Sequence, residues 1–205
     1  MNSSISLGFA LRRNVSLASY TTIKIGGAAS YFAEPTNEQE IVKLLEWARK
    51  ENLPFMILGN GSNVVFDDEG YSGLVIGMRR FKNDHIQIDH ERPSIRVAAG
   101  VTLSHLAKAC LEAGLSGTEF LAHIPGTLGG ALIMNAGFSR HAGQRNAIGD
   151  LVQEVTALRQ DGSKVVLERA DLKFGYRQSN LHEYLILDAE LILWKRPKEY
   201  IRQEV

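Results

Sequence analysis

A glycine-rich turn follows a short apolar run in the first half of the sequence. Residues 59–63 read Gly-Asn-Gly-Ser-Asn, and residues 53–58 before them suit a buried strand. The two glycines permit positive φ, so successive backbone N–H groups can converge on an anion, and Ser62 and Asn63 add side-chain donors. The turn predicts a site for phosphate oxygens, although a tight β-turn with asparagine in the left-handed region explains it equally well.

Two features of the sequence narrow the choice of ligand for this turn. No lysine follows at the spacing of a Walker A loop, which disfavours triphosphate chemistry. The sequence also lacks a Gly-x-Gly-x-x-Gly turn, which argues against a nucleotide held in the Rossmann manner.

A second glycine-rich segment, residues 124–137, reads Ile-Pro-Gly-Thr-Leu-Gly-Gly-Ala-Leu-Ile-Met-Asn-Ala-Gly. Its glycines leave much of the main chain bare, as expected where a flat ligand lies against the backbone. Pro125 fixes the turn in front of them. Close packing of a helix on a strand also explains Gly129 and Gly130, so that alternative stays open at this point.

Composition excludes several other functions. Lys plus Arg and Asp plus Glu both number 23, so no net charge draws the chain to nucleic acid or to an anionic membrane. The short basic run Arg79, Arg80 and Lys82 is typical of a solvated face. Cys110, the sole cysteine, excludes an internal disulfide and a cysteine metal cluster, and its helical context predicts a core residue.

The remaining sequence predicts a cytoplasmic protein without metal or membrane. The six histidines show no metal-binding spacing. The first 13 residues lack the apolar region of a signal peptide, and no stretch is long enough to span a bilayer.

The elements that would position the two glycine-rich segments alternate between strands and helices, which argues for an α+β fold. The expected strands are residues 30–33, 53–58, 64–66, 74–76, 86–88, 95–98, 152–158, 164–167 and 185–194. One helix is expected at 37–51 after an N-cap at Thr36, and a second ends near Gly114 after a cap at Thr102 or Ser104. We expect the last strand to be buried on both faces, and a helix to begin within residues 195–205.

Four segments together resemble the UDP-N-acetylenolpyruvoylglucosamine reductase family. They are residues 22–27 (Thr-Ile-Lys-Ile-Gly-Gly), 59–63, 124–130 and 174–179 (Phe-Gly-Tyr-Arg-Gln-Ser), in the order and at the spacing of that family. The resemblance implies an α+β FAD-binding fold of the vanillyl-alcohol-oxidase (PCMH) type. It divides the chain into an N-terminal segment at 1–20, FAD-binding subdomains at 21–78 and 79–194, and the start of a further domain at 195–205.

The same resemblance implies an NADPH-dependent flavoenzyme of peptidoglycan synthesis and assigns its residues by position. Residues 59–63 would hold the FAD diphosphate, and the second segment would line the flavin. The implied cofactor-binding residues are Thr22, Gly26, Gly59, Asn60, Gly61, Ser62, Asn63, Ile124, Pro125, Gly126, Thr127, Gly129, Gly130, Ala131, Asn135, Gly137 and Ile186.

Arg177 is the implied catalytic residue, and Tyr176 and Arg177 are the implied contacts to a UDP-sugar enolpyruvyl substrate. In the reaction of the family that the chain resembles, hydride passes from NADPH to the flavin and then to the enolpyruvyl double bond, and a guanidinium can bind the carboxylate where negative charge develops. Without the resemblance, Arg177 would be interpreted as a surface arginine paired with Asp171 or Glu183.

The sequence also departs from the family pattern. The family's serine in a Gly-Ser-x-Phe-Lys-Asn-Pro context, which protonates the substrate, and its later glutamate have no match here. We therefore expect a chain that supplies the FAD-binding part, lacks the C-terminal substrate domain and turns substrate over poorly. His123, Arg140 and His141 are unusual beside the cofactor segment. The alternatives are an FAD-binding module without turnover, and an α+β protein whose glycines merely serve turns.

Overall fold

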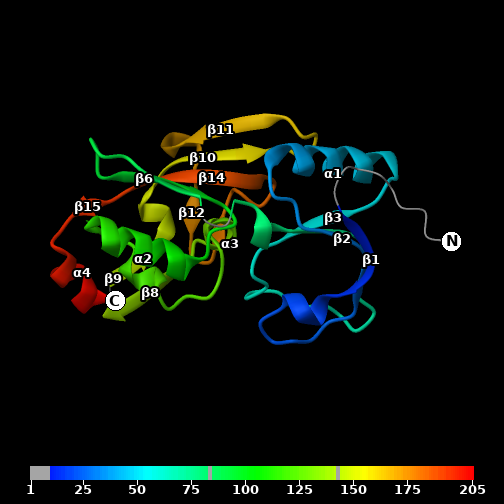
Figure 1. The fold of residues 1–205 in the computed structure, drawn as a ribbon, viewed down its shortest axis with the longest axis horizontal. Coiled ribbons are helices and arrows are strands. Elements are labelled where there is room, and N and C mark those ends of the chain that lie inside the picture. Colours follow the sequence, from blue (N-terminus) through cyan, green and yellow to red (C-terminus); the bar gives the residue numbers. More distant parts are fainter. Residues whose placement is uncertain (1–9, 83–84, 142–143) are drawn as a thin grey trace.

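A four-stranded sheet and a five-stranded sheet form the body of the molecule (Figure 1). The computed structural model describes the backbone of residues 10–82, 85–141 and 144–205, and the side chains of these residues apart from 139–145. Arg140 and His141, which the sequence singled out, therefore lie outside the described side chains.

The first sheet has the strand order β1-β2-β4-β3. Its strands are β1 (Leu11–Ser16), β2 (Ala28–Ala33), β3 (Phe55–Leu58) and β4 (Tyr71–Gly77). Strand β4 runs parallel to both β2 and β3, so β3 and β4 end at the same edge of the sheet, whereas β1 is antiparallel to β2. The division of the chain near residue 78 stays a prediction.

Helix α1 (Glu38–Lys50) connects β2 to β3 and buries an apolar stripe that includes Ile41, Leu44 and Leu45. This stripe belongs to one core cluster that also contains residues of β4 and of the second sheet, so α1 joins the two sheets. The N-cap is Asn37, whose side chain accepts a hydrogen bond from Glu40 N, so the prediction of Thr36 was wrong by one residue. Thr36 instead donates its backbone N–H to the Glu40 carboxylate.

Residues 64–66 are not a strand, contrary to the prediction. Phe66 is 8% exposed and belongs to a small second core with Leu17, Phe32 and Val75. Phe66 and the partly buried Val64 therefore reflect packing in this second core and not the pairing of a strand, whereas Val65 is exposed.

The second sheet has the order β11-β10-β14-β6-β5, and all of its neighbouring strands are antiparallel. Its strands are β5 (Ile86–Ile88), β6 (Ser94–Ala98), β10 (Val152–Leu158), β11 (Lys164–Glu168) and β14 (Leu185–Ile192). Smaller pairs are β7 (Leu115–Ser116) with β15 (Trp194–Lys195), β8 (Gly137–His141) with β9 (Gln144–Ala147), and β12 (Phe174–Gly175) with β13 (Gln178–Ser179).

Strand β14 is not buried on both faces, so that prediction was wrong. One face packs in the core, but Asp188 and Glu190 on the other face are only partly buried. Arg96 of β6 lies between them and neighbouring Glu154, and it donates to Asp188 and Glu154 at 2.7 Å each. Because these charges are paired and half-exposed, an otherwise apolar strand tolerates them.

Helices cover the second sheet. The prediction for helix α2 (Leu103–Ala113) is confirmed at both ends: the Thr102 side chain accepts from His105 N, and Gly114 closes the helix in the left-handed conformation at φ 69°. Cys110 is 1% exposed, as predicted for a core residue, and burial raises the pKa of its thiol to about 12. Helices α3 (Leu128–Ile133) and α4 (Lys198–Glu204) complete the fold.

In the part of the chain that the structure describes, no helix has the length and apolarity to cross a membrane.

Candidate functional site

Two adjoining cavities lie between the first sheet and helix α3. The first cavity, of about 600 Å³, and the second, of about 640 Å³, share lining residues at the end of β3 and in α3. The residues common to both are Ile57, Gly59, Thr127, Gly130 and Ile133. Gly59, the first residue of the turn that follows β3, therefore lies where the two cavities join.

The turn at residues 59–63 lines the second cavity and is held closely by its neighbours. Thr22 donates its backbone N–H to the Gly61 carbonyl at 3.0 Å and its hydroxyl to Ser62 Oγ at 3.3 Å. Gly61 has φ 67°, and a Cβ there would overlap the carbonyl oxygen of Tyr20. A Cβ at Gly59 would lie 2.7 Å from Thr127 Oγ1, so a larger residue there would displace that hydroxyl, whereas the backbone contact and positive φ at Gly61 require glycine.

The two adjacent glycines of α3 have different surroundings. A Cβ at Gly129 would lie 3.1 Å from Ala99 Cβ, so this glycine permits the helix to pack closely on the segment after β6. A Cβ at Gly130 would meet only Thr127 Oγ1, at 3.8 Å, and Gly130 lines both cavities. The packing explanation that the sequence left open is therefore correct for Gly129, whereas Gly130 leaves bare backbone towards the cavities.

Tyr176 and Arg177 form the tip of the β12–β13 hairpin and line the second cavity. Arg177 has φ 54°, which a non-glycine residue adopts only when its surroundings hold it there. Arg177 is exposed and lines the second cavity, and within the described part of the chain no salt bridge joins it to Asp171 or Glu183.

Asn135 and Ser179 hold this hairpin against α3. The Asn135 amide donates to the Gly175 carbonyl at 2.8 Å and accepts from Gly149 N at 3.0 Å, and the residue is 6% exposed. Ser179 Oγ donates to the carbonyl of Ile133 at 3.0 Å. The position of Arg177 therefore depends on hydrogen bonds made by the segment that lines the cavity.

We expect Asn135→Asp to lower the free energy of unfolding by about 2–3 kcal/mol, because a buried carboxylate oxygen would face the Gly175 carbonyl and leave it without a donor. The control is Asn180→Asp. Asn180 also bridges two backbone groups, Asp171 O and Lys173 N, but is more exposed, so we expect a loss below about 1 kcal/mol. Urea unfolding followed by circular dichroism measures the free energy of unfolding of both variants. Equal losses in the two variants would contradict the role of Asn135 as the buried residue that holds the hairpin.

The structure brings most of the predicted site residues to the two cavities. Those lining the second cavity are Gly59, Asn60, Gly61, Ser62, Asn63, Ile124, Pro125, Gly126, Thr127, Gly130, Ala131, Asn135, Gly137, Tyr176 and Arg177. Gly129 and Ile186 line the first cavity, which also shares Gly59, Thr127 and Gly130. Thr22 and Gly26 line neither: Thr22 supports the turn, and Gly26, at φ 124°, packs against Phe66. Their roles towards a ligand stay predictions.

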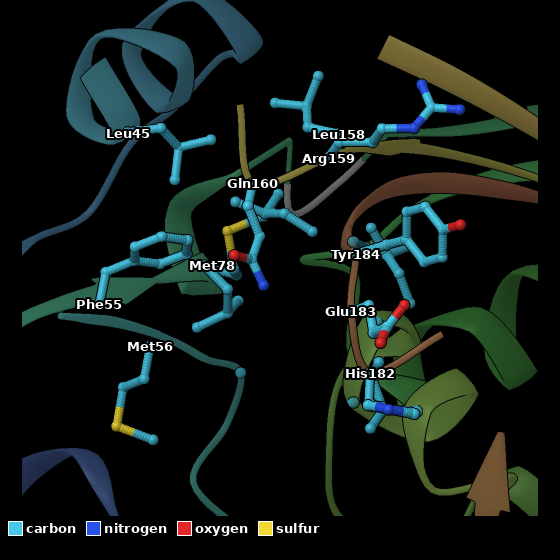
Figure 2. Close-up of a pocket in the computed structure, with 18 of the residues that line it drawn as sticks. Leu45, Phe55, Met56, Met78, Leu158, Arg159, Gln160, His182, Glu183 and Tyr184 are labelled. Atoms are coloured by element: carbon cyan, nitrogen blue, oxygen red, sulfur yellow. The ribbon is translucent and has the colours of Figure 1, made fainter. Parts of the chain in front are cut away.

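The sequence did not predict two parts of the site: the residues that line the first cavity opposite α3, and Arg79. Figure 2 shows part of this cavity lining, where Phe55 of β3 points towards Gln160 and Met78, whereas the neighbouring Met56 points to the other side of the strand. Arg79 is half-buried and donates to two backbone carbonyls, so the prediction of a solvated face was wrong for this residue, whereas Arg80 is exposed.

His123 makes a contact outside the two cavities. The ring Nε2 of His123 lies 2.8 Å from the Val205 carbonyl oxygen, and the residue lines neither cavity. Among the described residues, no group of three or more His, Cys, Asp or Glu side chains is placed to hold a metal ion.

Comparison with known proteins agrees with the fold. The family model described as FAD binding domain matches residues 29–168. The UDP-N-acetylenolpyruvoylglucosamine reductase of Prochlorococcus marinus (strain NATL2A) is 37% identical over 195 residues, which are 94% of this chain and 65% of that protein. The corresponding protein of Chlamydia felis is 35% identical over 185 residues, 89% of this chain and 60% of the relative. The chain thus spans about 60–65% of the length of these relatives.

Solved structures give the same result. The crystal structure of the Thermus caldophilus UDP-N-acetylenolpyruvylglucosamine reductase has a TM-score of 0.77 and 32% identity, and the match covers 95% of this chain and 67% of that one. The 6-hydroxy-D-nicotine oxidase of Arthrobacter nicotinovorans, at 14% identity and a TM-score of 0.66, shows the fold alone.

The predicted α+β fold of the vanillyl-alcohol-oxidase type is confirmed by these matches, and FAD is the cofactor of the matched family. The four segments that carried the resemblance lie within the portion shared with the reductases. The chain belongs to the FAD binding domain family and, within it, to the family of UDP-N-acetylenolpyruvoylglucosamine reductases.

Proposed function

We propose that this chain binds FAD across the two joined cavities and supplies the FAD-binding part of an NADPH-dependent UDP-N-acetylenolpyruvoylglucosamine reductase. The observation that carries the proposal is the position of Gly59, which lines both cavities at the start of the turn. FAD is a dinucleotide with its diphosphate in the middle, so a phosphate-binding turn at the junction of two cavities suits it. The NADPH donor, the role in peptidoglycan synthesis and a cytoplasmic location belong to the same proposal and rest on family membership.

The residues present fit such a ligand. Gly61 and Ser62 offer backbone and hydroxyl donors to the diphosphate, and the bare backbone at Gly130 admits a flat ring against α3. The first cavity would take the adenosine half. Its walls are largely apolar, with Gln160 and Tyr184 among the few polar groups that can fix a base (Figure 2). When bound, FAD supplies the chemistry of accepting and passing on a hydride.

Arg177 would bind the carboxylate of the enolpyruvyl group. It lines the second cavity together with Tyr176, which is 75% exposed and accessible to a large substrate. A guanidinium stays charged throughout the working pH range and can donate two parallel hydrogen bonds to a carboxylate. Negative charge that develops on that side of the substrate during reduction would be stabilised by the same group.

Titration of the protein with FAD, followed by quenching of flavin fluorescence, tests the proposal. We expect saturable binding at one FAD per chain. FMN, which lacks the adenosine half, should bind at least about tenfold more weakly, because the first cavity then gains no contacts. Absence of binding by FAD would refute the proposed function. Equal binding of FAD and FMN would refute the assignment of the first cavity to adenosine.

A further inference from the structure

Arg79 lies beside the turn at residues 59–63 because of the way two strands pair. Strands β3 and β4 are parallel, with Leu58 opposite Gly77, so the chain leaves both strands at the same edge of the sheet. The turn begins directly after Leu58, and Arg79 lies in the short 3-10 helix Met78–Arg80 directly after Gly77. The backbone alone therefore brings an arginine to the back of the turn.

We propose that Arg79 is a positioning residue for the diphosphate site, which fixes the turn in its anion-binding conformation and places a positive charge behind it. The inference rests on the proposed function, because it assigns the turn to a diphosphate. Arg79 lines neither cavity, so its action on a ligand passes through the turn and through its electric field.

The hydrogen bonds of Arg79 join two segments that are distant in sequence. Its Nη2 donates to the Asn60 carbonyl at 3.1 Å and to the Tyr20 carbonyl at 3.0 Å. The guanidinium carbon also lies 5.3 Å from the centroid of the Tyr20 ring. Since the Tyr20 carbonyl is also the group that excludes a side chain at Gly61, Arg79 holds together the two sides of that close contact.

The bond to Asn60 sets the direction of a peptide group in the turn. The peptide bonds of the described residues are trans, so the N–H of Gly61 points away from the Asn60 carbonyl that Arg79 holds. A carbonyl held in this way cannot turn towards a phosphate oxygen, which it would repel. Gly61, whose N–H is thereby oriented, lines the second cavity. Arg79 therefore favours the backbone arrangement that a phosphate requires.

The charge of Arg79 has no salt-bridge partner among the described residues. Its hydrogen-bond acceptors are two backbone carbonyls, and within the described part of the chain no carboxylate forms a salt bridge with it. Arg79 is half-buried, so bulk water screens its charge less than that of the exposed Arg80. An unpaired cation behind the turn favours a diphosphate at the turn over a neutral ligand.

Binding of two fragments of FAD, measured by isothermal titration calorimetry, separates this role from a general effect on folding. ADP carries the diphosphate, whereas riboflavin carries no phosphate. We expect Arg79→Met to weaken ADP binding about tenfold and riboflavin binding less than about twofold. The matched control is Arg80→Met, which removes the same charge from the next residue and should change both affinities by less than about twofold.

Salt provides a second readout that a purely structural role would not change. The affinity of the wild-type protein for ADP should fall as KCl is raised from about 0.05 to about 0.5 M, and the Arg79→Met variant should lose most of this dependence. Arg79→Lys keeps the charge but replaces the planar fork of donors. We expect Arg79→Lys to retain the salt dependence and to bind ADP more weakly than the wild type. This variant replaces Arg79→Met in the test if Arg79→Met does not fold.

The outcomes distinguish this inference from the proposed function. If the wild-type protein binds no FAD, the proposed function fails. If it binds FAD while Arg79→Met leaves ADP affinity unchanged, or weakens ADP and riboflavin equally without altering the salt dependence, the inference about Arg79 is overturned and the proposed function stands.

Discussion

We expect Gly130→Leu to weaken FAD binding at least about a hundredfold while making the ligand-free protein slightly more stable. Gly130 lines both cavities, and the nearest neighbour of a Cβ added there is Thr127 Oγ1 at 3.8 Å. Because the Cβ itself has room, we expect the leucine to extend into the space that the cofactor needs. Gly130 also lies inside helix α3, where leucine has a helix propensity about 0.8 kcal/mol more favourable than glycine.

The opposite signs of these two effects make the prediction easy to contradict. Flavin fluorescence titration gives the affinity, and urea unfolding of the ligand-free protein gives the stability. The control is Gly129→Ala, whose added Cβ lies 3.1 Å from Ala99 Cβ and should cost about 1 kcal/mol of stability through overpacking. A Gly130→Leu protein that binds FAD as tightly as the wild type would show that the cofactor does not lie against α3.

Local signals in the sequence predicted the ends of helices better than they predicted short strands. Thr102 and Gly114 bound α2 through contacts with their immediate neighbours, so the sequence sufficed there. Strand β1 and the hairpin β12–β13 were not predicted. Their residues are mixed in polarity, and β1 exists because it pairs with β2, where Leu11 lies opposite Ala33. Such pairing is a property of the fold and leaves little periodicity in the strand itself.

In the site, too, the sequence predicted the features that depend on neighbouring residues and did not predict those that depend on distant segments. Glycines indicate backbone that is not covered by side chains, so the sequence alone identified both glycine-rich segments as candidate binding segments. The sequence alone cannot separate Gly129 from Gly130, because successive residues of a helix point about 100° apart and only the fold shows which of them faces Ala99. Arg79 was missed for a related reason: its acceptors are main-chain carbonyls of Tyr20 and Asn60, which any residue type can provide.

Arg177→Ala should leave FAD binding within about threefold of the wild type, lower the affinity for the proposed enolpyruvyl substrate at least about a hundredfold and abolish any residual reduction of it. Tyr176 and Arg177 line the second cavity from a hairpin whose fold is held by Asn135 and Ser179, so removing the guanidinium leaves the flavin side of the cavity intact. Perturbation of the flavin absorbance on addition of UDP-N-acetylenolpyruvoylglucosamine measures substrate affinity directly.

Two further variants identify what Arg177 contributes. Arg177→Lys keeps the positive charge without the bidentate fork and should recover only part of the affinity. Arg169→Ala removes an equivalent charge near the same hairpin, where Arg169 lies over the Phe174 ring at 5.8 Å, but Arg169 lines neither cavity, so substrate binding should be unchanged. If Arg177→Ala instead loses FAD, the arginine holds the cofactor or the hairpin and does not bind the substrate carboxylate. Because flavin binding and substrate binding are measured separately, a role of Arg177 in holding the cofactor is distinguished from a role in binding the substrate carboxylate.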